Sequence, residues 1–269
     1  MIRLAFASWL VSTLATAADV PAEIVERFEP RTFEYTASSG EKRELKYRLL
    51  KPAHIEEGKK YPLVIFLHGA GERGDDNLKQ LKYLPEWMAA DDWRAKFPCF
   101  LIAPQCPSDR WWAPLRGARS DASREKQRLL DTQLDGLVGL IDASEAELPI
   151  DTDRLYLTGL SMGGFGSWAL AAREPTRFAA VVPICGGGDP AWAETLRDIP
   201  IWVAHGGADR VVPPVKSREM VDALKAVGGH PQYTELEGVG HDSWTPTYQD
   251  PQGPLPWMFE QVKSQKPAQ

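Results

Sequence analysis

Residues 155–164, with the sequence LYLTGLSMGG, decide the fold because they pass from a buried strand into a helix through one tight turn. The first four residues form an apolar run typical of a strand buried on both faces, and Gly163–Arg173 is a predicted helix. Glycine on either side of Ser161, at positions 159 and 163, lets the strand and the helix approach closely. The strained turn between them would expose the Ser161 hydroxyl above the end of the sheet, where a nucleophile is expected.

Similar apolar runs recur on both sides of this segment, separated by stretches with helical spacing. Runs without polar alternation are typical of parallel strands that are covered by helices on both faces. The predicted strands are Leu63–Leu67, Phe100–Ala103, Leu155–Thr158, Ala179–Ile184, Ile201–Ala204 and Tyr233–Leu236. The predicted helices are Leu78–Ala90, Arg124–Glu147, Gly163–Arg173, Ala191–Leu196, Ser217–Val227 and Leu255–Val262, with Pro246–Pro256 as a surface loop. This repetition of strand and helix predicts one doubly wound α/β domain.

The segment before these runs has a different pattern. Phe33–Leu50 alternates charged and apolar residues, and Gly40 lies where a turn would fall. Such alternation is typical of antiparallel strands with one solvated face. Short antiparallel strands are therefore predicted ahead of the mostly parallel sheet.

The first residues indicate export. Arg3 precedes the apolar run Leu4–Leu14, and residues 15–17 (ATA) form a small-residue cleavage site. This order is typical of a secretory signal peptide, and the run is well short of the ~20 apolar residues that span a bilayer. We therefore predict a signal peptide at 1–17, a single domain at 18–269, and a secreted or periplasmic protein without a stable membrane span.

Composition excludes several classes of function. The 269 residues are 43% hydrophobic and carry a net charge of −6, with no run of Lys or Arg, so binding to nucleic acid is not expected. Neither an H-E-x-x-H motif nor clustered Cys and His residues occur, so no metal and no cofactor are expected. Cys99, Cys106 and Cys185 are odd in number; buried free thiols are favoured, and a Cys99–Cys106 bridge stays open. Nothing in the sequence predicts the oligomeric state.

A serine nucleophile needs a base and an orienting acid, which in this kind of fold follow it in the order Ser, acid, His. His241 lies in a glycine-containing loop after the last predicted strand, whereas His230 precedes that strand. Asp209 is the first carboxylate after the strand before the last, and Asp189 and Asp242 are the alternatives. Ser161, Asp209 and His241 are therefore the predicted catalytic residues.

Ester or amide cleavage also needs hydrogen-bond donors for the developing oxyanion. One predicted donor is the backbone amide of Met162, in the first turn of the helix after Ser161, where amides have no partner. The second should come from the glycine-rich loop Leu67–Gly74, where Ala70 is the first choice and Gly71 the alternate.

Five sequence blocks together resemble a known group of proteins. They are HGAGERGDDN (68–77), APQCP (103–107) with Trp111 and Trp112, GLSMGG (159–164), HGGADRVVP (205–213) and GHDSWTPTYQDP (240–251). In this order they resemble the single-domain esterases and peptidases related to the catalytic domain of prolyl oligopeptidase and, more distantly, polyhydroxybutyrate depolymerases and feruloyl esterases. The resemblance spans roughly Lys60 to the final helix.

The resemblance implies an α/β-hydrolase fold, with a mostly parallel central sheet and helices on both faces. It assigns the same three catalytic residues and implies that Gly71, Glu72, Trp112 and Trp244 contact substrate, although Trp111 and Trp112 could instead pack in the core. The chain has no room for a propeller domain and no long insertion that would form a large lid, so an open site is expected.

The function expected from these observations is that of a serine carboxylesterase. The expected substrates are small, aryl or carbohydrate-linked esters, free or attached to a polymer. The alternatives are an exported serine peptidase of the same group, a polyester depolymerase, and a binding protein on a hydrolase scaffold.

Overall fold

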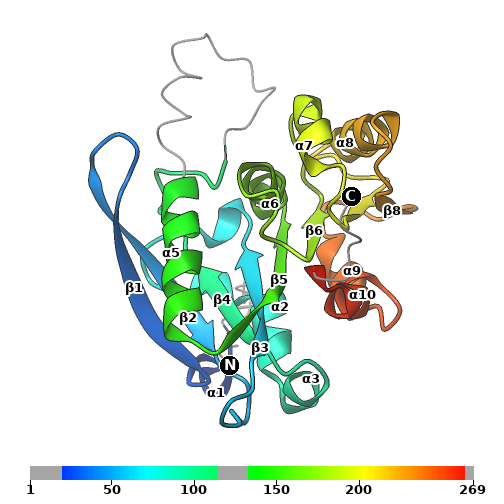
Figure 1. Cartoon of the computed structure of the whole chain (residues 1–269). Helices are drawn as coiled ribbons and strands as arrows, with labels where there is room; N and C mark the ends of the chain where they lie inside the picture. Colours follow the sequence, from blue (N-terminus) through cyan, green and yellow to red (C-terminus); the bar gives the residue numbers. More distant parts are fainter. Residues whose placement is uncertain (1–19, 114–132, 264–269) are drawn as a thin grey trace, which may run out of the picture.

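The computed structural model describes residues 20–113 and 133–263, and within these ranges eight strands form one sheet (Figure 1). Their order across the sheet is β1-β2-β4-β3-β5-β6-β7-β8. The pairs β1–β2 and β2–β4 are antiparallel and the other pairs are parallel. The strands are β1 (Phe28–Thr36), β2 (Lys42–Leu50), β3 (Tyr61–Leu67), β4 (Phe100–Pro104), β5 (Ile150–Leu160), β6 (Ala180–Ile184), β7 (Trp202–Gly206) and β8 (Gln232–Leu236). The predicted mostly parallel sheet with antiparallel strands at its N-terminal edge is confirmed.

Helices cover both faces of the sheet. The α-helices are α1 (Ala22–Val25), α2 (Leu84–Ala89), α3 (Asp91–Lys96), α5 (Leu134–Glu147), α6 (Met162–Arg173), α7 (Ala193–Leu196), α8 (Val215–Ala226), α9 (Trp244–Gln249) and α10 (Pro254–Glu260). Short 3₁₀ turns lie at η1 (Ala70–Glu72), η2 (Lys79–Leu81) and η3 (Pro190–Trp192). Apolar side chains of α5, α6, α7 and α8 share one core cluster, and those of α2, α9 and α10 share the other. None of the helices in the described ranges is long and apolar enough to cross a membrane.

The buried strands supply both clusters because successive side chains point to opposite faces of a sheet. In β3, Leu63, Ile65 and Leu67 face the α5–α8 side, whereas Val64 and Phe66 face the other side. All five side chains are fully buried. This double burial is the physical reason that the run reads as continuously apolar rather than alternating.

The structure corrects the predicted helix boundaries in two places. The predicted helix Leu78–Ala90 is interrupted at Tyr83, whose φ of 68° no helix accommodates, and the separate helix α3 follows it. Much of the predicted loop Pro246–Pro256 is helical instead, because α9 continues to Gln249 and α10 begins at Pro254. The prediction missed α9 because Pro246 lies in the first turn of the helix, where its missing N–H needs no acceptor.

Some predicted segments fall outside the described residues. They are the signal peptide 1–17 and the first part of the helix Arg124–Glu147, and residues 114–132 as a whole are not described. The absence of a large lid therefore stays a prediction.

Glycine is required at positions 159 and 163, where β5 ends and α6 begins. A Cβ at position 163 would lie 1.8 Å from the carbonyl oxygen of Leu67, and one at position 159 would lie 2.5 Å from the carbonyl oxygen of Gly163. Both contacts are with backbone, which cannot move aside as a flexible side chain would. These glycines bring the helix N-terminus against the ends of β3 and β5 and thereby position Ser161.

We expect Gly163→Ala to lower the free energy of unfolding by about 3 kcal/mol or more, because the new methyl group would force the helix away from β3. Gly71→Ala is the matched control, since a Cβ at position 71 meets no atom within 4 Å. Urea denaturation of the two variants and the wild type measures the difference. Equal stability of the two variants would contradict the close approach described here.

Candidate active site

Ser161 occupies the turn between β5 and α6 in a strained backbone conformation. Its φ is 52° and its ψ is −115°, in a region that residues other than glycine rarely adopt. The turn is held by hydrogen bonds from the Ser161 amide to the Ile184 carbonyl, at 2.9 Å, and from the Phe165 amide to the Ser161 carbonyl, at 3.1 Å. Hydrogen bonds to β6 and within α6 therefore hold Ser161 in a backbone conformation that serine rarely adopts.

His241 links this serine to a carboxylate. Its Nε2 lies 3.0 Å from Ser161 Oγ, and its Nδ1 lies 2.7 Å from Oδ2 of Asp209. An ionised carboxylate only accepts hydrogen bonds, so Nδ1 carries the proton and Nε2 is left to accept from the serine hydroxyl. The loop after β8 carries His241 and the turn after β7 carries Asp209, so residues far apart in the sequence meet at one edge of the sheet.

Asp209 is fixed from several sides. Its side chain is fully buried, and its Oδ1 accepts hydrogen bonds from the amides of Val211 and Val212. Burial raises the pKa of this carboxyl, but hydrogen bonds from His241 and from the two amides outweigh burial, so the pKa lies below its usual value. Asp209 is therefore ionised over the pH range in which His241 needs an orienting anion.

The alternative residues lie elsewhere. Asp189 accepts a hydrogen bond from the Ala191 amide at the start of η3, and Asp242 accepts one from the Thr245 amide at the start of α9. His230 precedes β8, at the opposite end of that strand from His241. Of the three carboxylates considered, the structure places Asp209 against the imidazole.

His205 also contacts Asp209, although the order of the catalytic residues along the chain excluded His205 as the base. Its Nε2 lies 3.3 Å from Asp209 Oδ2 and 2.9 Å from the Val212 carbonyl oxygen, and its Nδ1 lies 2.7 Å from Ser217 Oγ. The signal was present in the HGGAD block, where His205 is the next-to-last residue of β7 and Asp209 follows four residues later. The contact is visible only once the turn between them is folded.

Two backbone amides are free to face an oxyanion. Met162 is the first residue of α6 and Ala70 is the first residue of η1, and within the described residues neither amide donates to a protein acceptor. Gly69 brings the loop against the nucleophile turn, because a Cβ at that position would lie 2.9 Å from Leu160 Cδ1. Gly71, the alternate donor, is exposed beside Ala70.

Of the three side chains predicted to contact substrate, one does not face the site. Trp112 is fully buried and donates a hydrogen bond from Nε1 to the His68 carbonyl at 3.0 Å, so it packs in the core. The Trp244 ring lies 5.4 Å from the His241 ring, edge to face. Glu72 is half-buried at the end of η1, and burial raises the pKa of its carboxyl. Trp244 and Glu72 stay candidates for contact with substrate.

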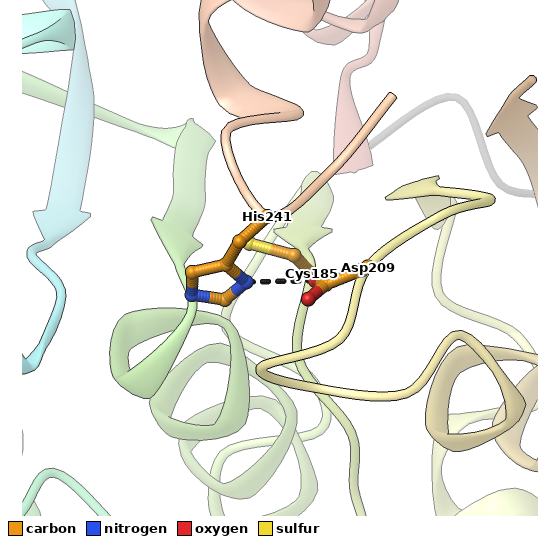
Figure 2. A group of neighbouring side chains, drawn as sticks. All are labelled: Cys185, Asp209 and His241. Carbon is orange, nitrogen blue, oxygen red and sulfur yellow. Dashed lines mark hydrogen bonds and ion pairs between the residues drawn. The ribbon is translucent and has the colours of Figure 1, made fainter. Parts of the chain in front are cut away.

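Among the described residues, Cys185, Asp209 and His241 form a group that could hold a metal ion (Figure 2), with ligand atoms all within 4.8 Å of one another. Asp209 and His241 are already joined by a hydrogen bond, and burial raises the pKa of the Cys185 thiol to about 12. Because the thiolate is the form that binds metals, a protonated thiol is a poor ligand. The group fits a hydrogen-bonded couple beside a neutral thiol better than a metal centre.

All three cysteines are free and buried, so the alternative Cys99–Cys106 bridge is absent.

His68, at the end of β3, is a fully buried imidazole next to the candidate oxyanion loop. Its Nε2 accepts from the Cys106 amide at 2.9 Å, and its Nδ1 lies 2.6 Å from the Gly69 carbonyl oxygen. Burial lowers the pKa of this imidazole to about 4. The ring is therefore neutral at the pH values where a serine nucleophile would work.

This burial predicts a pH dependence of stability. Between pH ~6.5 and ~4 the unfolded chain binds a proton at His68 and the folded chain does not, so stability is complete above that window and falls through it by up to about 3 kcal/mol. Urea denaturation at pH 7 and pH 4.5 should show a smaller loss in His68→Asn than in the wild type. The same loss in both proteins would mean that His68 does not titrate in this way.

The sheet, the Ser161 turn and the Ser–His–Asp arrangement together define an α/β-hydrolase. The chain belongs to the phospholipase/carboxylesterase family, which it matches over residues 53–252.

Individual relatives agree with the predicted resemblance. The chain is 28% identical over 149 residues to poly(3-hydroxyalkanoate) depolymerase C of Paucimonas lemoignei (44% of this chain and 33% of that protein). It is 29% identical over 167 residues to the "Probable feruloyl esterase C" of Aspergillus terreus (62% and 56%). The crystal structure of a thermostable esterase superposes with a TM-score of 0.78 at 38% identity, covering 89% of this chain and 64% of that one. These matches span about one third to two thirds of the relatives' lengths.

Proposed function

We propose that the protein is a serine carboxylesterase that works through an acyl-enzyme. The observation that carries the proposal is the position of the His241 imidazole, 3.0 Å from Ser161 Oγ on one side and 2.7 Å from Asp209 on the other. This geometry fits general-base activation of a serine hydroxyl, the step that makes a weak nucleophile reactive.

In the first half of the reaction, Ser161 Oγ attacks the ester carbonyl while its proton passes to His241 Nε2. The tetrahedral oxyanion accepts hydrogen bonds from the amides of Met162 and Ala70, and Asp209 stabilises the imidazolium. The C–O bond to the alcohol then breaks, and His241 returns the proton to the leaving alcohol. Water attacks the acyl-serine by the same route, which releases the acid and restores the Ser161 hydroxyl.

The proposed substrates are small, aryl or carbohydrate-linked esters. The name of the feruloyl esterase supports aryl esters, and that of the thermostable esterase supports ester hydrolysis in general. Trp244 is buried and belongs to a core cluster, but its ring lies edge to face with His241, which supports an aromatic wall beside the catalytic imidazole. Polyesters are the second candidate, favoured by the match to the depolymerase.

Matched ester and amide substrates test the bond that is cleaved. Phenyl acetate and acetanilide differ at one atom, and the proposal expects turnover of the ester and little or none of the amide. Comparable turnover of both would favour the peptidase alternative, and hydrolysis of neither by folded protein would refute the proposed activity. A panel of acetyl, butyryl, feruloyl and polyester substrates then ranks the acyl groups.

Export of a single domain is the second part of the proposal. Residues 1–17 have the order of a signal peptide, and the strands and helices of residues 20–113 and 133–263 contribute to one sheet and its two faces, which supports one domain from residue 18 onward. Expression of the full chain in a bacterium and mass measurement of the mature protein test it. The expected N-terminus is Ala18, and a protein that keeps Met1 in the cytoplasm would refute export.

A further inference from the structure

His68 is a buried polar side chain that the proposed chemistry does not use. It lies at the junction of β3 and η1, between the strand that precedes the candidate oxyanion loop and the segment that follows β4. The Cys106 amide can only donate a hydrogen bond, so the His68 Nε2 that it contacts must be the acceptor. The proton of the neutral ring is therefore on Nδ1, which donates it to the Gly69 carbonyl oxygen at 2.6 Å.

The bond to Gly69 fixes a peptide plane that matters for the site. The Gly69 carbonyl and the Ala70 N–H belong to the same peptide unit, and the described residues contain no cis peptide bond. In a trans peptide these two groups point in opposite directions. When His68 holds the carbonyl on its own side, the Ala70 N–H is turned to the other side, where within the described residues it has no protein acceptor.

The imidazole is itself anchored independently of the loop. The Cys106 amide holds its Nε2, the Trp112 indole donates to the His68 carbonyl at 3.0 Å, and the two rings lie 5.0 Å apart, edge to face. These contacts come from the segment after β4, not from η1. A donor that is fixed on one side of a peptide unit favours the orientation in which the carbonyl of that peptide points toward it.

We propose that His68 is a positioning residue for the oxyanion hole: its Nδ1–H holds the Gly69 carbonyl and thereby aims the Ala70 amide at the oxyanion. This inference rests on the proposed function and deepens it. His68 touches no reacting atom and acts through the peptide between Gly69 and Ala70.

Two amide substitutions separate the two hydrogen bonds of His68. The carboxamide of His68→Asn reaches the position of Nδ1 and can donate to the Gly69 carbonyl, whereas that of His68→Gln reaches the position of Nε2 and can replace only the acceptor for Cys106. Both variants lose the ring, so both should lose thermal stability. With phenyl acetate, kcat should fall by about 10- to 100-fold in His68→Gln with little change in KM, and His68→Asn should retain most of it.

The inhibition constant of a trifluoromethyl ketone reports on the oxyanion hole itself, because this inhibitor binds serine hydrolases as an adduct that carries an oxyanion. A general loss of stability would not change it. Its Ki should rise in His68→Gln by the same factor as kcat falls, while the Ki of the matched methyl ketone stays near its wild-type value. Equal kcat losses in the two variants, or a loss of kcat without a change in Ki, would overturn the inference.

Nitrogen-15 NMR of the wild-type imidazoles tests the same point without any requirement that a variant folds. The His68 signals, assigned by their absence in His68→Asn or by backbone connectivity, should show a protonated Nδ1 and an unprotonated Nε2 at pH 7. The opposite tautomer would overturn the inference. If the wild type does not hydrolyse phenyl acetate, the proposed function is refuted instead. Wild-type kinetics measured beside the variants distinguish that outcome from a failure of this inference.

Discussion

Ser161→Ala should lower kcat/KM for phenyl acetate by about 10⁴-fold or more, because no other group can form the acyl-enzyme. The substitution removes one oxygen and leaves the strained turn, its two backbone hydrogen bonds and the helix N-terminus in place. The fold should therefore survive, and the thermal midpoint should stay near that of the wild type. Steady-state kinetics and thermal unfolding of the same preparation measure both effects.

The control for this loss is Ser144→Ala. Ser144 is a buried serine in α5, and its hydroxyl donates to the Leu140 carbonyl at 2.7 Å, remote from the Ser161 turn. This variant should keep wild-type activity. A Ser161→Ala protein that retains a tenth or more of wild-type turnover would rule out the proposed nucleophile.

Asp209→Asn should lower kcat by about 10³- to 10⁴-fold, because an amide at this position can donate to Nδ1 of His241 and so favours the tautomer with the proton on Nε2. In that tautomer Nε2 cannot accept the serine proton. The side chain keeps its size, and an amide oxygen can still accept from the amides of Val211 and Val212.

Asp189→Asn and Asp242→Asn are the matched controls, since each removes one carboxylate charge from a turn near the same edge of the sheet. Both should keep kcat close to that of the wild type. A larger loss in either control than in Asp209→Asn would transfer the orienting role to that residue.

The sequence predicts best where one physical requirement decides the residue. The run Leu63–Leu67 is apolar throughout because both of its faces are covered, and Gly163 has no alternative beside the Leu67 carbonyl. The chain order of serine, acid and histidine selected the three side chains that the structure brings into contact. These features depend on local pattern and on the general topology of the fold.

Other features depend on contacts that no local pattern encodes. The break at Tyr83 and the start of α9 at Trp244 both lie at the core cluster shared by α2, α9 and α10, of which Trp244 is a member and against which Tyr83 packs. His205 was excluded by chain order and yet contacts the buried carboxylate of Asp209. Trp112 belongs to an aromatic pair in the sequence, but its indole lies in the core and donates to the carbonyl of His68, the residue that follows β3.

The most direct test of the central claim is covalent labelling of the native protein with a fluorophosphonate, followed by peptide mapping. A serine activated by His241 should react stoichiometrically at neutral pH, and the label should be on the peptide that contains Ser161. Labelling should disappear after unfolding in urea, because the imidazole and the hydroxyl then separate. A folded protein that takes up no label, or takes it up at another serine, would contradict the account.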